Sequence, residues 1–126
     1  MYYIGEIDLD MFKAITSEIR TKEVIITEDR IKHIIERRGL EFYNKFGERF
    51  RDIIEAPDYI FKDTRENTAL VCKKFYEENK YINIVLRVVV ISDNPEYRNS
   101  IITAIGESEK RFLQRLRNNT PIYQKE

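Results

Sequence analysis

The sequence of 126 residues has one cysteine, one histidine, no tryptophan, 4 glycines and 3 prolines. The single cysteine, Cys72, excludes an internal disulfide and a thiolate-rich zinc site. The single histidine, His33, excludes a metal centre built from several histidines. The glycines and prolines are scattered, so no linker, repeat or low-complexity tract marks a domain boundary. We therefore expect one domain over residues 1–126, without a cofactor.

The sequence also lacks a charge excess and a long apolar run. Its 22 Lys and Arg residues balance 22 Asp and Glu residues, so any attraction to nucleic acid or anionic lipid needs a local patch. The longest apolar stretch, at 84–91, is interrupted by Arg87 and is too short to span a bilayer. The first ten residues contain no basic segment followed by an apolar one. We expect a soluble, cytoplasmic protein that does not act in a membrane.

The first half of the chain has mainly helical periodicity. A short strand or entry segment is expected at 2–7, and apolar spacing predicts a helix at 9–19. A short apolar run at 24–26 leads to Thr27, which can cap a helix at 28–38 that ends at Gly39. A further helix is expected at 40–55, interrupted at Gly47, before Pro57 stops it.

After Pro57 the pattern becomes extended and rich in β-branched and aromatic residues. It predicts strands at 59–61, 68–76, 81–91 and 99–105, with short polar connections typical of an antiparallel meander. Ser108 can then cap a short basic helix at 109–117, followed by an apolar pair at 122–123. Helices before strands predict an α+β fold: N-terminal helices packed on one face of a four- to five-stranded antiparallel sheet, with a short C-terminal helix.

A basic cluster surrounds the only histidine. At about 100° per residue, Arg30, His33 and Arg37 share one side of the helix at 28–38, away from its isoleucine stripe. The two guanidinium groups favour a neutral imidazole, which can accept a proton as a general base must. Together they can also hold a phosphate. The same pattern is typical of an ordinary solvated helix face, and spacing alone does not decide between the two.

Arg87 is a charge among apolar residues in the strand at 81–91. Alternation places it on the opposite sheet face from Leu86, and a buried charge without a partner is costly. If residue 91 pairs with Asn99, Arg87 lies opposite Thr103; a slip of one residue brings Ser100 to that face instead. An ion pair with a carboxylate from a packed helix is the alternative.

The C-terminal helix carries a local excess of positive charge, from Lys110, Arg111, Arg115 and Arg117. Such a patch would make salt-dependent phosphate contacts with nucleic acid. A solvated helix explains these charges equally well. Cys72 lies in an alternating strand without an acid or base beside it, so we interpret it as a packing residue.

Several spaced blocks of the sequence resemble a known group of nucleases. The blocks are VIITEDRIKHIIERR, IIEAPDYIFKD, ENTALVCKKF, NIVLRVVV, NPEYRNSIITA and SEKRFLQRLRNNTPIYQKE. From about Ile4 to the C-terminus the chain resembles the phage- and mobile-element-associated nucleases of the barnase/EndoU/colicin/RelE-like superfamily, the BECR fold. The resemblance implies helices packed on a four- or five-stranded antiparallel sheet, and metal-independent cleavage of RNA.

The resemblance also implies functional positions. The matching helix and strand residues are His33, Arg37, Arg87, Asn99, Ser100 and Thr103. The chain departs from the pattern at one place: relatives read Arg-His-Pro at the end of the first helix, whereas this chain has Arg37-Arg38-Gly39. A second histidine is missing, so a mechanism with two histidines is not available to it.

We therefore expect an endoribonuclease in which His33 removes the 2′-hydroxyl proton, and Arg87 with Arg37 stabilises the phosphorane, giving a 2′,3′-cyclic phosphate. Ser100 or Thr103 would orient a phosphate oxygen. Further substrate contacts are expected from Arg30, Asn99, Lys110 and Arg111. This arrangement requires His33 and Arg87 to face one cleft. The alternative is a non-catalytic module that binds nucleic acid, an inhibitor or a host protein, which the missing histidine and zero net charge favour.

Overall fold

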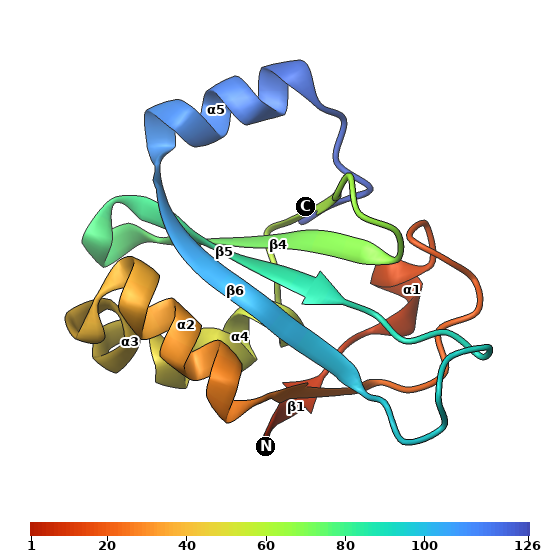
Figure 1. The fold of residues 1–126 in the computed structure, drawn as a ribbon. Helices are drawn as coiled ribbons and strands as arrows, with labels where there is room; N and C mark the ends of the chain where they lie inside the picture. Colours follow the sequence, from red (N-terminus) through yellow and green to blue (C-terminus); the bar gives the residue numbers. More distant parts are fainter.

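A seven-stranded mixed sheet forms the centre of the fold (Figure 1). The structure is a computed structural model and describes residues 1–126. Across the sheet the strands are β1 (Tyr2–Glu6), β2 (Glu23–Ile26), β6 (Asn99–Ser108), β5 (Lys80–Arg87), β4 (Thr68–Phe75), β3 (Tyr59–Lys62) and β7 (Tyr123–Gln124). Neighbouring strands are antiparallel except β2 and β6, which pair in parallel at two positions.

The predicted α+β class is confirmed, but the sheet is larger than the four or five strands expected. The strands from β3 to β6 form the expected antiparallel meander. The strand β1, with 5 residues, is the short strand expected at 2–7, and the additional strands, β2 and β7, have 4 and 2 residues. Such short runs carry little periodicity of their own, so their place in the sheet is decided by backbone pairing with longer strands.

The helix at Glu28–Arg38, α2, has the predicted bounds. The Thr27 hydroxyl accepts a hydrogen bond from the backbone N–H of Arg30, which caps the first turn. The helix ends at Gly39, whose φ of 97° lies in the left-handed region that glycine adopts without steric cost. The following helices, α3 (Leu40–Phe46) and α4 (Phe50–Glu55), are separated by a 3₁₀ turn at Gly47–Arg49, where the interruption was expected.

Two predicted elements are shorter than expected, for one shared reason. The first helix, α1, covers Leu9–Phe12 instead of 9–19, and β5 ends at Arg87 instead of residue 91. The chain after α1 pairs with the chain after β5: the N–H of Arg20 donates to the Val89 carbonyl, and the N–H of Ile91 donates to the Glu18 carbonyl. These hydrogen bonds provide partners for backbone groups that lie beyond the ends of α1 and β5.

Two apolar clusters lie on opposite faces of the sheet. Along β5, Ile84 and Leu86 belong to the larger cluster, which includes residues of α2, α3 and α4. Tyr81 and Val85 belong to a smaller cluster on the second face, together with Phe61, Leu70, Cys72 and Phe112. Because side chains alternate along a strand, Arg87 points to the second face, as expected from its spacing to Leu86.

The C-terminal helix α5 (Glu109–Asn118) covers part of this second face, across the sheet from α3 and α4 (Figure 1). It begins at Ser108, whose hydroxyl accepts from the N–H of Arg111. Its anchor is Phe112, which is fully buried and stacks on Tyr81 with ring centroids 3.7 Å apart. Cys72 is buried in the same cluster, and burial raises the pKa of its thiol. None of the helices is long and apolar enough to cross a membrane.

The packing of α5 on the sheet should depend on the ring of Phe112. We expect Phe112→Ala to lower the free energy of unfolding by about 3–5 kcal/mol, because it removes the buried aromatic contacts and leaves a cavity. Leu113, the next residue, is 43% exposed, so Leu113→Ala should change stability by about 0.5 kcal/mol or less. Urea denaturation of both variants measures the difference. Equal losses would show that α5 is not held by this ring.

Candidate functional site

A pocket of about 420 Å³ lies where β2, β5 and β6 meet the loop at 88–98. We call it the Arg87 pocket. Its lining combines guanidinium groups, carboxylates, hydroxyls and apolar side chains, from Met1, Ile25, Thr27, Arg87, Val89, Asp93, Glu96, Tyr97, Arg98 and Ser100. Two of the predicted site residues, Arg87 and Ser100, are therefore brought together.

Arg87 occupies the last position of β5, between Thr68 on β4 and Ser100 on β6. Its side chain is 34% exposed, its Nη2 lies 3.5 Å from Oδ2 of Asp93, and its Nη1 donates to the Val88 carbonyl. The ion-pair partner of Arg87 is therefore Asp93, a carboxylate of the loop, rather than a carboxylate from a packed helix.

The predicted pairing of Arg87 with Thr103 is wrong. Thr103 lies opposite Val85, whereas Ser100 lies opposite Arg87, because a bulge at Ile102 shifts the register between the two pairs. A bulge places an extra residue on one strand, so neither of the two regular registers considered from the sequence could produce this arrangement. The Thr103 hydroxyl oxygen is buried without a hydrogen-bond partner, and Thr103 does not line the pocket.

Arg98 is the second guanidinium of the pocket, and the sequence did not single it out. Its Nε lies 3.7 Å from a carboxylate oxygen of Glu23, and its Nη1 donates to backbone carbonyls of the loop that precedes it. The polar stretch at 92–98 was interpreted only as a connection between strands. Its mixture of Asp, Glu, Tyr and Arg is the signal that could have marked it, because loops on rigid scaffolds often carry binding residues.

Hydrogen bonds from other parts of the fold hold the loop at 88–98, which lines the pocket. Arg20 donates to the carbonyls of Asp93 and Tyr97, and Oδ2 of Asp93 accepts the N–H of Val90. Asn99 is fully buried; its Nδ2 donates to the Thr21 carbonyl at 2.6 Å and its Oδ1 accepts from the Val89 N–H at 2.8 Å. Asn99 therefore supports the loop from inside the fold, which differs from the substrate contact expected of it.

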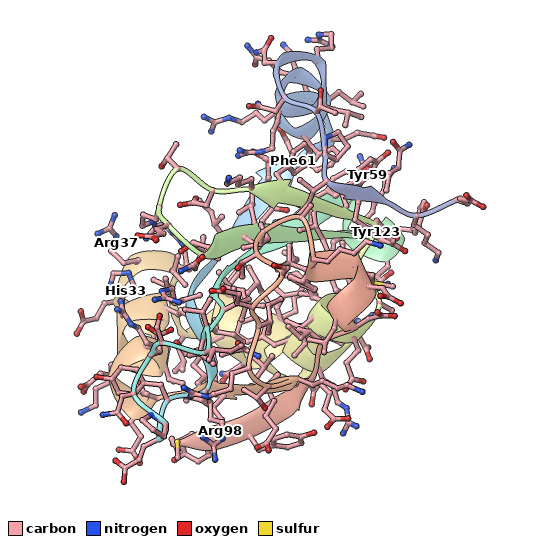
Figure 2. All side chains as sticks on the ribbon, turned by 90° about the vertical axis from the view of Figure 1, so that its right-hand side faces the viewer. His33, Arg37, Tyr59, Phe61, Arg98 and Tyr123 are labelled. Atoms are coloured by element: carbon pink, nitrogen blue, oxygen red, sulfur yellow. The ribbon has the colours of Figure 1, made fainter.

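His33, Arg30 and Arg37 share an outer side of α2, as their spacing predicts. Arg30 and Arg37 are exposed and His33 is half-buried, and no hydrogen bond or ion pair involves their side chains. Figure 2 shows His33 and Arg37 together on this helix, apart from Arg98. The helix is oriented by Ile34, which is buried in the larger cluster, and by Arg38, whose Nε donates to the Ala104 carbonyl on β6.

His33 does not line the Arg87 pocket, so this pocket is not the single cleft expected to contain both His33 and Arg87. The connection between them is Thr27, the cap of α2, which lines the pocket. His33 follows Thr27 by six residues, which corresponds to roughly 9 Å along the helix axis. The helix that carries the histidine therefore begins at the wall of the pocket.

The basic residues of α5 form a separate region. Lys110 and Arg111 are exposed, and Arg111 borders a polar depression of about 240 Å³ that shares no residue with the Arg87 pocket. In Figure 2, α5 and Arg98 lie at opposite ends of the molecule. Arg115 is already paired, because its guanidinium donates to both carboxylate oxygens of Glu107, at 3.3 and 2.8 Å.

Glu107 connects α5 to the sheet, since it also accepts from Nδ2 of Asn83 at 3.0 Å. Burial by itself would raise the pKa of the Glu107 carboxyl, but the hydrogen bonds from Arg115 and Asn83 outweigh burial and hold the pKa below its ordinary value. A carboxyl with a lowered pKa in the folded state stabilises the fold above its unfolded pKa. It loses that contribution as the pH falls through the folded value.

Glu107→Gln should therefore destabilise the protein at neutral pH, and the difference from the unmodified protein should shrink as the pH falls below about 4.3, the ordinary value for glutamate. Urea unfolding between pH 7 and pH 3 measures this. Glu96→Gln is the control, because the Glu96 side chain is exposed and makes no hydrogen bond or ion pair. A Glu107→Gln deficit that is constant with pH would contradict the role of the charged carboxylate.

The support role of Asn99 is testable through stability. Asn99→Ala leaves the Val89 N–H and the Thr21 carbonyl without partners, and we expect a loss of about 2–3 kcal/mol in the free energy of unfolding. Ser100 is the matched control: it is the next residue, it lines the pocket, and its hydroxyl makes no hydrogen bond. Ser100→Ala should cost about 0.5 kcal/mol or less. Unchanged stability in Asn99→Ala would contradict the support role.

Comparison of the chain with protein-family models, with curated proteins and with solved structures found no match. What the site can bind therefore follows from its own chemistry. The Arg87 pocket offers two guanidinium groups, two carboxylates, two hydroxyls and a phenol ring, and α2 carries an imidazole with two guanidinium groups beside it.

Proposed function

We propose that the chain binds RNA, with a phosphate held in the Arg87 pocket. The observation that carries this proposal is the presence of Arg87 and Arg98 in the lining of one pocket, together with the hydroxyl of Ser100. A planar guanidinium matches two phosphate oxygens at once. The carboxylate contacts of Arg87 and Arg98, at 3.5 and 3.7 Å, are longer than the 2.7–2.9 Å typical of charge-assisted hydrogen bonds. Both guanidinium groups therefore retain donors for a ligand.

Two properties of the pocket favour a single nucleotide of an unpaired strand over a duplex. Its volume of about 420 Å³ is that of a small-molecule site. It also includes Tyr97, which is 59% exposed, and proteins stack unpaired bases on exposed aromatic rings. Because the net charge of the chain is zero, such binding depends on these local contacts rather than on attraction by the whole molecule.

Binding of a short unstructured RNA, followed by fluorescence anisotropy, tests the proposal. We expect Arg87→Gln and Arg98→Gln each to weaken binding about tenfold, the effect of losing a hydrogen bond to a charged group. Arg117→Gln is the control, because it removes an exposed cation from α5 and should leave binding within about twofold. Equal weakening by all three variants would indicate a diffuse charge effect, and absence of binding would refute the proposal.

Cleavage of the bound RNA is the second candidate function, and the position of His33 favours it. The imidazole and the Arg37 guanidinium have no partner within the protein, and their helix begins at the pocket wall. An RNA strand that leaves the pocket along α2 would reach His33 within a few nucleotides, given the roughly 9 Å between Thr27 and His33 along the helix axis. The resemblance to BECR nucleases supports the same activity.

The reaction would proceed on the strand itself. His33 takes the proton of a 2′-hydroxyl, and the 2′ oxygen attacks the adjacent phosphorus while Arg37 stabilises the added negative charge. The bond from phosphorus to the 5′ oxygen then breaks, and that oxygen takes a proton from water. The products are a 2′,3′-cyclic phosphate and a free 5′-hydroxyl. In this arrangement Arg87 holds a neighbouring phosphate instead of the reacting one.

Incubation of mixed RNA with the protein in EDTA tests cleavage separately from binding. We expect the unmodified protein to produce 2′,3′-cyclic phosphate ends, and His33→Ala to reduce the rate by at least about 100-fold, the usual contribution of a general base. Lys32→Ala, on the neighbouring exposed position of α2, should retain full activity. Binding without cleavage would leave a non-catalytic RNA-binding module, and equal cleavage by His33→Ala would remove His33 from the reaction.

A further inference from the structure

The Arg87 pocket contains more carboxylates than a simple phosphate site requires. Asp93 has a structural explanation, since Oδ2 accepts the Val90 N–H at 2.9 Å and lies 3.5 Å from the Arg87 guanidinium. Glu96 has none: its side chain is exposed and forms no hydrogen bond or ion pair. A free carboxylate repels a bound phosphate, but it accepts hydrogen bonds from a ligand group that donates them.

Glu96 is held in position by its own turn. Its backbone N–H donates to Oδ1 of Asn94 at 2.9 Å, and the N–H of Tyr97 donates to the Asn94 carbonyl at 3.0 Å. The Arg20 guanidinium fixes the same turn through the carbonyls of Asp93 and Tyr97. The carboxylate is therefore presented to the pocket from a backbone that is anchored on both sides.

Tyr97 also lines the pocket and provides an aromatic surface. Its ring is 59% exposed, it belongs to neither apolar cluster, and it has no aromatic neighbour within the protein. Its face is thus available to a ligand. One pocket then offers an aromatic surface for a base, guanidinium groups for a phosphate, and the carboxylate of Glu96.

We propose that Glu96 is a specificity-determining residue, which selects bases with an exocyclic amino group and rejects uracil. The inference rests on the proposed RNA binding and deepens it. With the base stacked on Tyr97, the Glu96 carboxylate accepts from the amino group of cytosine, as acidic side chains do in other nucleic-acid complexes. Uracil presents a carbonyl oxygen at the same place, so two acceptors would face each other without a proton between them.

The test compares two oligonucleotides whose bases differ only at C4 and N3, where cytosine has an amino group and an acceptor nitrogen and uracil has a carbonyl and an N–H. We expect the unmodified protein to bind a short cytidine oligomer about tenfold more tightly than a uridine oligomer of equal length. Glu96→Gln should bring this ratio close to one, because an amide can donate to the uracil carbonyl as well as accept from cytosine. The ratio is the readout, since removal of a negative charge will raise affinity for both oligomers.

Two further variants separate base selection from general effects. Glu48→Gln makes the same charge change at an exposed residue on the turn between α3 and α4, and it should keep the tenfold ratio. Tyr97→Leu should weaken binding of both oligomers by a similar factor, because stacking is tolerant of base identity. This pattern distinguishes loss of the stacking surface from loss of the selecting carboxylate.

The outcomes also separate this inference from the proposed function. Equal affinity of the unmodified protein for both oligomers, or a ratio that Glu96→Gln leaves unchanged, overturns the role of Glu96 while RNA binding stands. Failure of both oligomers to bind overturns the proposed function and this inference together.

Discussion

A buried amide at the start of β6 holds together the two segments from which the pocket is built. Asn99 is the first residue of β6 and pairs with Val24 of β2, and the next residue, Ser100, pairs with Arg87 of β5. The Asn99 side chain joins the Thr21 carbonyl to the Val89 N–H. Both segments leave regular structure nearby, α1 early and β5 at Arg87. Their backbone groups would otherwise be buried without partners, which is costly. The position of Arg87, Asp93 and the following turn depends on this junction.

The bulge at Ile102 determines which residue of β6 lies beside Arg87. Regular pairing would have continued the register of Val85 and Thr103 to the end of the strands, but the extra residue brings Ser100 beside Arg87. Thr103 is left with a buried hydroxyl, away from the pocket. One inserted residue on one strand therefore decides which polar side chain accompanies the guanidinium.

The positive charge of this neutral chain is divided among three surfaces rather than concentrated on one. Several cations are neutralised locally, as in the pairs Lys45–Glu78, Lys74–Glu109 and Arg115–Glu107. The outer side of α2, the Arg87 pocket and the exposed part of α5 retain donors for a ligand. The first two adjoin at Thr27, whereas α5 lies at the other end of the molecule (Figure 2). A strand bound along α2 and the pocket is compatible with this layout without any contribution from α5.

Features that depend on local chemistry follow from the sequence alone. The bounds of α2 follow from Thr27 and Gly39, the break between α3 and α4 from Gly47, and the face of Arg87 from alternation along β5. Contacts between distant segments produce the features that the sequence does not show: the addition of β2 and β7, the bulge, and the absence of His33 from the Arg87 pocket. Periodicity reports which side of an element is apolar, but it carries no information about which partner covers that side. Glu96, Tyr97 and Arg98 lie in a segment without periodicity, so only the folded chain shows that they share a pocket.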